Sequence, residues 1–163
     1  MKRADFVRPD WTTYFMNIAR VVATRSNCRR RKVGAVIVRE TRIVSTGYNG
    51  TPRGVRNCYE GGCPRCAGAS RKGASLEQCL CSHAEENAIV QAACHGISIE
   101  GAVLYSTVSP CLLCAKMIVN AGIREVFYET AYAFDRQAGA LLREAGVGIR
   151  RVGRAARRKA AAR

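Results

Sequence analysis

The 163-residue sequence has few acidic residues, few aromatic side chains and no long hydrophobic run. Its longest stretch without a charged residue, 101–115, falls short of the ~20 residues that a membrane-spanning helix needs. No apolar segment near the start forms the core of a secretory signal, so we expect a cytoplasmic protein without a membrane partner. Apolar residues make up 48% of the chain, which is too many for a disordered protein and fits one domain with its own core.

The scarcity of acidic residues gives a formal net charge of +15, from 27 basic and 12 acidic residues. Residues 150–163 contain seven basic residues and no acidic one. We expect a single domain over residues 1–152 and a disordered basic tail over 153–163. A second basic cluster at 25–32 precedes a predicted strand. Such charge favours phosphate-bearing partners, whether a nucleotide, a nucleic acid or an anionic surface.

Nine cysteines in a chain without an export signal favour metal ligands or catalytic thiols over disulfides. Cys111 and Cys114 form a Pro-Cys-Leu-Leu-Cys motif at the start of a helix expected over 111–121. The free N–H groups of a first helical turn stabilise negatively charged sulfur. The two thiolates are therefore expected to bind one metal ion.

His83 and Glu85 lie at the start of another expected helix, over 82–95. Together with Cys111 and Cys114, His83 completes a set of three protein ligands, which leaves a fourth position for water, as in catalytic zinc sites. Glu85 can lie beside the metal without binding it and can transfer protons. This His-x-Glu…Pro-Cys-x-x-Cys pattern is typical of zinc-dependent nucleobase deaminases.

The pattern of apolar residues predicts alternating strands and helices. A helix is expected from a cap at Asp10 to Thr24. Its buried face consists of apolar residues at helical spacing, namely Trp11, Phe15, Ile18 and Val22. The other elements are strands at 33–39, 42–47, 102–107, 125–128 and 147–152, and helices at 82–95, 111–121 and 135–145. The alternation predicts a sheet with helices on both faces.

A loop of roughly thirty residues, 48–78, is longer than ordinary connections, and such loops need an explanation. Five cysteines lie in or beside it, at Cys58, Cys63, Cys66, Cys79 and Cys81, and Cys28 lies before the predicted strand at 33–39. Cys63-Pro-Arg-Cys66 has the spacing of a metal site. Our hypothesis is a second, structural zinc; the alternative is a mobile loop with free thiols.

Five segments of the chain carry a resemblance to a known family: 28–38, 46–54, 83–89, 98–102 and 109–118. The chain resembles the deoxycytidylate (dCMP) deaminases of the cytidine deaminase-like superfamily, and bacterial late-competence proteins share the pattern. The resemblance implies a three-layer αβα sandwich with a central mixed five-stranded sheet. It also implies zinc-dependent deamination of dCMP to dUMP and ammonia, with Glu85 as the proton-transferring residue.

The resemblance assigns further roles. Some dCMP deaminases hold a second zinc; here Cys28 and Cys58 match its ligands, with either Cys79 and Cys81 or Cys63 and Cys66. Asn49 matches the residue that binds the sugar 3′-hydroxyl, and the backbone at Ala84 and Ser109 would bind the base edge. For the 5′-phosphate we expect Arg30 or Arg31, with Tyr132 as a hydroxyl donor.

Many members of this family are hexamers that dCTP activates and dTTP inhibits. The residues that match their effector region are Gly47, Tyr48, Gly50 and Arg53. By this resemblance we expect a homo-oligomer with dCTP and dTTP as effectors.

Two other functions remain open from the sequence. A deaminase acting on tRNA or single-stranded DNA would use the basic tail, but an aromatic content of 7% provides few stacking surfaces for bases. A zinc-stabilised nucleic-acid-binding protein without catalysis would have no use for Glu85.

Overall fold

The computed structural model describes residues 8–68, 78–132 and 136–153. All but the first residue of the tail predicted over 153–163, and part of the long loop, lie outside these residues. In chain order the elements are α1 (Trp11–Thr24), β1 (Gly34–Arg39), β2 (Arg42–Tyr48), the 3₁₀ turn η1 (Cys58–Glu60), α2 (Pro64–Ala67), α3 (Ala84–Cys94), β3 (Val103–Val108), α4 (Leu112–Asn120), β4 (Glu125–Thr130), α5 (Arg136–Glu144) and β5 (Gly148–Arg151).

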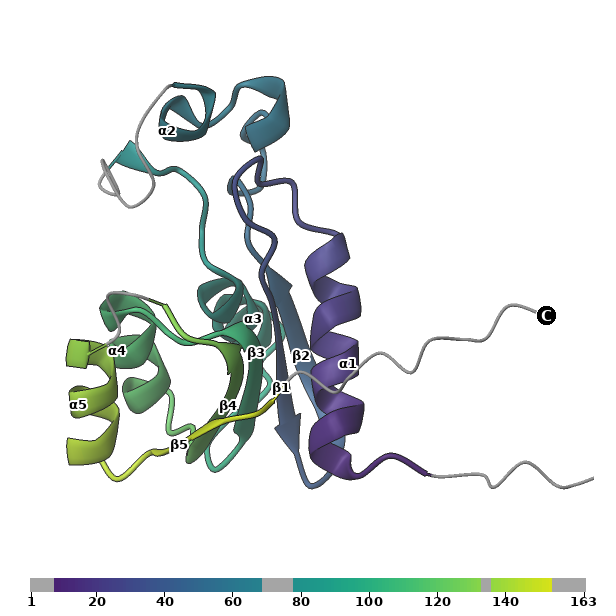
Figure 1. Ribbon diagram of the computed structural model, residues 1–163, viewed down its shortest axis with the longest axis vertical. Helices are drawn as coiled ribbons and strands as arrows, with labels where there is room; N and C mark the ends of the chain where they lie inside the picture. The colour runs from purple at the N-terminus through teal and green to yellow at the C-terminus, as the bar shows by residue number, and fades with distance from the viewer. Residues whose placement is uncertain (1–7, 69–77, 133–135, 154–163) are drawn as a thin grey trace, which may run out of the picture.

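The five strands form one sheet in the order β2-β1-β3-β4-β5. The β1–β2 and β1–β3 pairs are antiparallel, whereas β3–β4 and β4–β5 are parallel. Helix α1 covers one face of the sheet, and α3, α4 and α5 cover the other (Figure 1). The predicted three-layer αβα sandwich with a mixed five-stranded sheet is confirmed. None of the helices described is both long and apolar enough to cross a bilayer.

Helix α1 begins as predicted, because the Asp10 carboxylate accepts a hydrogen bond from the Thr13 amide at 2.9 Å and caps the helix. Phe15 and Met16 are buried against the sheet. The prediction that Trp11 is buried was wrong: its side chain is 50% exposed. It lies in the first turn, beyond the edge of the core, and stacks on Phe15 with ring centroids 5.5 Å apart.

The β1–β2 hairpin packs closely between the two helical layers. A Cβ at Gly34 would overlap the Ala19 carbonyl oxygen of α1, and a Cβ at Gly47 would overlap the Ala84 carbonyl oxygen of α3. Glycine at both positions therefore lets strand backbone contact helix backbone. This contact fixes where α3 begins, and α3 carries part of the candidate site.

A second body of structure lies beyond one end of the sheet (Figure 1). We call it the cysteine lobe and define it as residues 26–32, 50–68 and 78–82. A pair of backbone hydrogen bonds between Gly50 and Ser82 connects its segments, with N–O distances of 3.2 and 2.9 Å. This bridge places the end of the lobe immediately before α3.

Candidate active site and cysteine cluster

The candidate active site lies where α3 and α4 begin. His83 is the N-cap residue of α3 and Cys111 is the N-cap residue of α4. The Glu86 carboxylate accepts a hydrogen bond from the His83 amide at 3.0 Å and stabilises the first turn of α3. Cys114 lies in the first turn of α4 and is fully buried. Two helix N-termini thus bring three metal-binding side chains to one place.

The three side chains have the geometry of a metal site. His83 Nδ1 lies 3.2 Å from Cys111 Sγ and 3.4 Å from Cys114 Sγ. The three donor atoms all lie within 4.8 Å of one another. One nitrogen and two sulfur donors suit zinc, and three protein ligands leave one tetrahedral position for water. The structure therefore brings together the three predicted ligands His83, Cys111 and Cys114.

The electrostatics of His83, Cys111 and Cys114 favour a negatively charged sulfur beside a positively charged imidazole. Hydrogen bonds from Cys114 and then His83 lower the pKa of the Cys111 thiol to about 4. The hydrogen bond to Cys111 raises the pKa of His83 to about 9. The hydrogen bond with Cys111, together with burial, raises the pKa of the Cys114 thiol. A thiolate held ready in this way is the form that binds a metal.

Glu85 lies beside the three donors and is 4% exposed. Its Oε1 accepts a hydrogen bond from Ser106 Oγ at 2.8 Å, and its Oε2 lies 3.8 Å from Cys114 Sγ. Burial raises the pKa of the Glu85 carboxyl. A raised pKa makes the carboxyl group a better proton acceptor, which suits a general acid–base residue.

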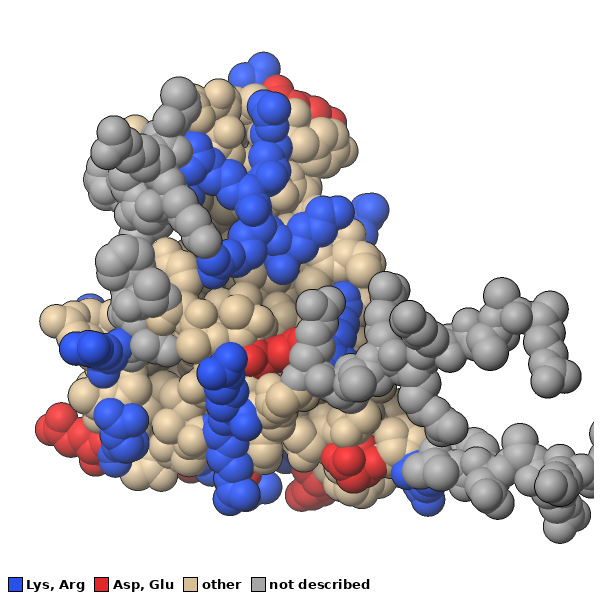
Figure 2. All heavy atoms as spheres, viewed as in Figure 1, with Lys and Arg blue, Asp and Glu red and all other residues tan. Residues whose placement is uncertain are grey.

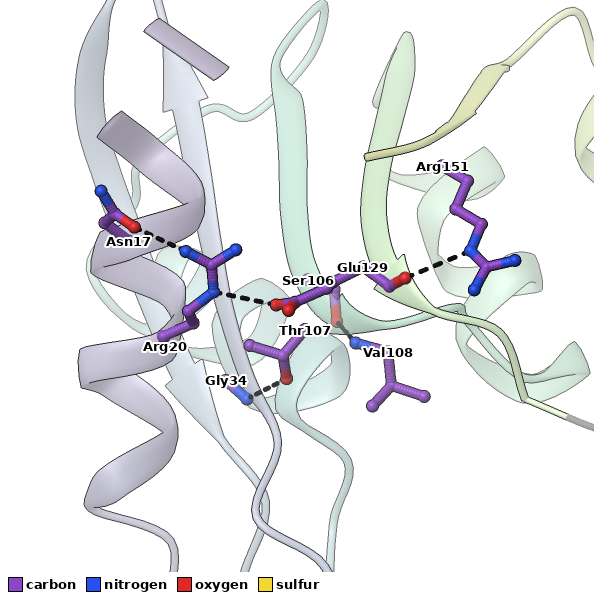
Figure 3. Close-up of polar contacts among 8 residues, drawn as sticks. All are labelled: Asn17, Arg20, Gly34, Ser106, Thr107, Val108, Glu129 and Arg151. Carbon is purple, nitrogen blue, oxygen red and sulfur yellow. Dashed lines mark hydrogen bonds and ion pairs between the residues drawn. The ribbon is translucent and has the colours of Figure 1, made fainter. Parts of the chain in front are cut away.

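Ser106 is a site residue that the sequence analysis missed. It is fully buried on β3, and its hydroxyl orients the Glu85 carboxylate. The signal was a serine within the buried strand 103–108, since a buried hydroxyl needs a hydrogen-bond partner. The adjacent Thr107 accepts a hydrogen bond from the Gly34 amide at 3.2 Å, which connects this end of β3 to β1 (Figure 3).

A polar network on the α1 face supports the neighbouring strands. Arg20 of α1 forms an ion pair with Glu129 of β4 at 2.9 Å, and Asn17 accepts a further hydrogen bond from Arg20 (Figure 3). Arg151 of β5 donates to the Glu129 carbonyl at 3.3 Å. The network connects α1 to the two strands that follow the site.

Asn49 has an internal structural role in this protein. It is buried, and its Oδ1 accepts hydrogen bonds from the Val33 amide at 2.7 Å and the Ser26 hydroxyl at 2.8 Å. Its Nδ2 donates to the Arg31 carbonyl at 2.8 Å. Asn49 therefore holds the segment before β1 in place.

The backbone positions expected to contact the base, Ala84 and Ser109, lie close in the chain to the ligands His83 and Cys111. Ala84 is the first residue of α3 and is buried. The Ser109 amide donates to the Thr130 carbonyl at 2.8 Å, so this N–H is already used within the fold. The Ser109 hydroxyl accepts a hydrogen bond from the Tyr132 amide at 2.7 Å. Ser109 thus connects the site to Tyr132.

The structure separates the two arginines that were expected to bind phosphate. The Arg31 guanidinium lies over the Tyr132 ring, 5.1 Å from its centroid. Arg30 is exposed and donates to the Gly68 carbonyl at 3.1 Å. Arg31 and Tyr132 are therefore brought together, whereas Arg30 contacts Gly68 within the cysteine lobe. Lys and Arg side chains gather on this part of the surface (Figure 2).

The four residues that match an effector region differ in their surroundings. Gly47 packs against α3, and Gly50 is bridged to Ser82. The Tyr48 carbonyl accepts a hydrogen bond from the Asn87 side chain at 2.8 Å, while its own side chain is 38% exposed. Arg53 is exposed. Only Tyr48 and Arg53 of the four present side chains to solvent.

The six cysteines of the lobe form one cluster that contains two groups of four. Within each group, the four sulfur atoms all lie within 4.8 Å of one another. The first group is Cys28, Cys58, Cys66 and Cys81, and the second is Cys63, Cys66, Cys79 and Cys81. The expected set of Cys28, Cys58, Cys79 and Cys81 is divided between the two groups. Cys66 takes the place of Cys79 beside Cys28 and Cys58.

The fold and the His-Cys-Cys site with its buried glutamate are those of the cytidine deaminase-like class. A family model described as "Cytidine and deoxycytidylate deaminase zinc-binding region" matches residues 9–130. The chain belongs to this family of cytidine and deoxycytidylate deaminases.

Individual relatives agree with this assignment. The chain is 51% identical to a deoxycytidylate deaminase of Schizosaccharomyces pombe over 87% of this chain and 45% of that protein. It is 42% identical to the deoxycytidylate deaminase of Mycobacterium phage D29 over 74% of this chain and 95% of that one. The chain thus spans less than half the length of the yeast relative.

A solved structure has the same architecture. The dCMP deaminase from the cyanophage S-TIM5, in complex with dCMP and dUMP, matches with a TM-score of 0.74 and 34% identity. The match covers 90% of this chain and all of that one.

Proposed function

We propose that this protein hydrolyses dCMP to dUMP and ammonia and so supplies dUMP for thymidylate synthesis. The observation that carries the proposal is the buried Glu85 carboxyl beside the His83, Cys111 and Cys114 donors. Deoxycytidylate deaminases among the relatives, one of them solved with dCMP and dUMP, support the choice of nucleotide.

The reaction needs one water molecule and several proton transfers. Zinc bound by the three donors would lower the pKa of a bound water to about 7 and so supply a nucleophile. Glu85 takes a proton from the water and delivers it to ring N3 while the water oxygen bonds to C4. Glu85 then passes the second water proton to the amino group, the C4–N bond breaks, and ammonia leaves.

Ser106 and the helix ends position the proton carrier. The Ser106 hydroxyl holds one carboxylate oxygen of Glu85 at 2.8 Å, which leaves the other oxygen toward the metal ligands. Burial of Glu85 excludes bulk solvent, so protons move between the carboxylate, the reacting water and the substrate.

The nucleotide phosphate would be held by Arg31 together with the Tyr132 hydroxyl. The Arg31 guanidinium lies over the Tyr132 ring, and Asn49 fixes the segment that carries Arg31. Charge-assisted hydrogen bonds of this kind distinguish a nucleotide from its nucleoside. Asn49 can still offer one amide hydrogen to the sugar 3′-hydroxyl.

We further propose that the cysteine lobe holds structural zinc. The groups of buried sulfurs in the lobe are of the closed, sulfur-only kind that binds zinc structurally. Since none of the nine cysteines forms a disulfide, a reducing compartment such as the cytoplasm suits the protein.

A homo-oligomer, in particular a hexamer, with dCTP and dTTP as effectors remains a prediction from family resemblance. Light scattering tests the hexamer, and a single-protomer mass would refute it. A velocity that responds to neither dCTP nor dTTP would remove regulation.

One assay tests the proposed activity against its rivals. Ammonia release is measured with dCMP, deoxycytidine, dCTP, and oligonucleotides that contain cytosine or adenine. Turnover of dCMP with little or none of the others is the expected result. Turnover of oligonucleotides alone would identify a polynucleotide deaminase instead. Salt-dependent oligonucleotide binding without any turnover would identify a binding protein.

A further inference from the structure

The two groups of sulfurs in the cysteine lobe share two members. Cys66 and Cys81 belong to both groups, whereas Cys28 and Cys58 belong to one and Cys63 and Cys79 to the other. A zinc–sulfur bond of about 2.3 Å places the sulfurs of one tetrahedral site ~3.8 Å apart. Separations below 4.8 Å bring each group within reach of this geometry. Two tetrahedra that share an edge have six corners, and the lobe provides six sulfurs.

We propose that the six cysteines bind two zinc ions as a binuclear Zn₂Cys₆ cluster, in which Cys66 and Cys81 bridge the two ions. Cys28 and Cys58 are the terminal ligands of one ion, and Cys63 and Cys79 are those of the other. With the catalytic ion, the chain holds three zinc ions.

Sulfur chemistry favours two ions over one. A single ion would bind four sulfurs and leave two thiols in contact with metal-bound thiolates. Two of the six cysteines, Cys58 and Cys63, are fully buried, so an unused thiol in either group would have no access to water. Two ions bind all six sulfurs, and their four positive charges offset four of the six negative charges of the thiolates.

The surroundings suit a cluster with net negative charge. Two zinc ions and six thiolates leave a net charge of −2. The lobe contains seven basic residues and one acidic residue. Arg65 lies between Cys63 and Cys66 in the sequence and is 9% exposed. The backbone amides of Arg30 and Arg31 also donate hydrogen bonds to the Cys28 sulfur. Such N–H donors stabilise thiolates bound to metal.

Packing leads to the same conclusion independently. In the described part of the lobe, every buried apolar side chain is a cysteine. Helix α2 has four residues and η1 has three, so regular structure contributes little stability. A segment without an aliphatic core needs a metal or disulfides to fold, and these cysteines form no disulfide.

The close spacing of the sulfurs also selects zinc over an iron–sulfur cluster. Both metals accept four thiolates in a tetrahedron. In an iron–sulfur cluster, however, sulfide ions bridge the irons, which holds the cysteine sulfurs further apart. Shared cysteine sulfurs leave no place for sulfide.

The decisive measurement is the zinc content of the full chain, purified with a reducing agent and counted by elemental analysis and native mass spectrometry. Three zinc ions per chain are expected. Two ions, or one, would overturn the binuclear cluster. The exposed Cys94 lies outside both groups, and Cys94→Ser is the matched control that keeps three ions.

A double variant tests the division into two groups. Cys63→Ser with Cys79→Ser removes both terminal ligands of one ion but leaves the group of Cys28, Cys58, Cys66 and Cys81 complete. The expected content falls from three ions to two. An unchanged content of three ions would show that Cys63 and Cys79 are not terminal ligands of a second ion and would overturn the division into two groups.

X-ray absorption at the zinc edge is measured on the unmodified protein, so this test does not depend on the folding of a variant. A zinc–zinc scattering distance is expected, because bridging thiolates hold two ions close together. Its absence would overturn the proposal. The inference is independent of dCMP deamination: three ions with a zinc–zinc distance in a protein that does not turn over dCMP would support the cluster while removing the proposed function.

Discussion

The two groups of metal-binding side chains in this protein are built in opposite ways. His83, Cys111 and Cys114 stand at the ends of helices that are held by a large apolar core around the sheet. The six cysteines of the lobe have no such frame, because they are themselves the buried core. In the first region the fold positions the ligands, whereas in the second we propose that the metal positions the fold.

This contrast predicts that substitutions in the two regions cause different losses. A change in the first region should remove chemistry and leave the sheet intact. A change in the second should remove local structure, and activity would fall only through the residues that the lobe holds. Four variants test whether chemistry and local structure are lost separately, beginning with the variant of largest expected effect.

Glu85→Gln should abolish turnover of dCMP while zinc content stays unchanged. The amide keeps the shape of the side chain but cannot carry protons, and general acid–base catalysis is worth roughly 10²–10⁴-fold at each step. Since Glu85 acts at more than one step, kcat should fall by at least about 10³-fold. Ammonia release and elemental analysis measure the two effects. A rate within tenfold of the unmodified protein would contradict the assigned role.

Cys58→Ser should unfold the cysteine lobe and spare the sheet. Cys58 is fully buried in the cluster and belongs to the group with Cys28. Losing a structural metal removes its binding free energy from folding. Hydrogen exchange should show loss of protection in 50–68, with strands β1, β3 and β4 still protected. Uniform loss over the whole chain would show that the two regions do not fold separately. Cys94→Ser serves as the control.

Arg31→Ala should weaken binding of dCMP far more than its maximum rate. A hydrogen bond to a charged group contributes about 1.5–3 kcal/mol, so KM should rise by roughly 10- to 100-fold. The matched control is Arg30→Ala, because Arg30 contacts Gly68 rather than Tyr132. Steady-state kinetics that gave equal effects for both variants would remove the specific role of Arg31.

Ser106→Ala should give the smallest effect. The hydroxyl orients Glu85 and touches no substrate, and a typical hydrogen bond contributes about 0.5–1.5 kcal/mol. We expect kcat to fall by roughly threefold to tenfold with KM little changed. Ser106→Thr keeps the hydroxyl and should recover most of the rate. A loss as large as that of Glu85→Gln would make Ser106 a direct participant.

Much of the sheet could be predicted because local patterns agree with the fold. The strands predicted at 33–39 and 42–47 lie within a residue of their observed bounds, and Glu40 and Thr41 form the turn between them. Both turn residues have positive φ, at 50° and 59°, as a two-residue hairpin turn requires. Alternation of strands and helices indicated layers, since each element must bury one face.

The candidate site was predictable where residues lie close in sequence and not where they come from different elements. The motifs at 83–85 and 111–114 determine their own geometry at helix ends. Ser106 reaches Glu85 only through the packing of α3 on β3, which no local spacing reveals. The grouping of the six cysteines likewise depends on how three separate segments meet, so Cys66 could not be preferred to Cys79 from the sequence.

The two glycines of the hairpin also set the thickness of the molecule beside the site. Gly34 pairs with Tyr48, and Gly47 pairs with Ala35, so both glycines lie at the same end of the hairpin, next to Asn49. There α1 and α3 are separated by strand backbone alone. Elsewhere the spacing between layers follows from the sizes of side chains, which sequence drift can change a methyl group at a time. At this end the spacing between the layers is set by the peptide backbone, whose dimensions are the same for every residue. The site can therefore keep its dimensions while the rest of the core varies.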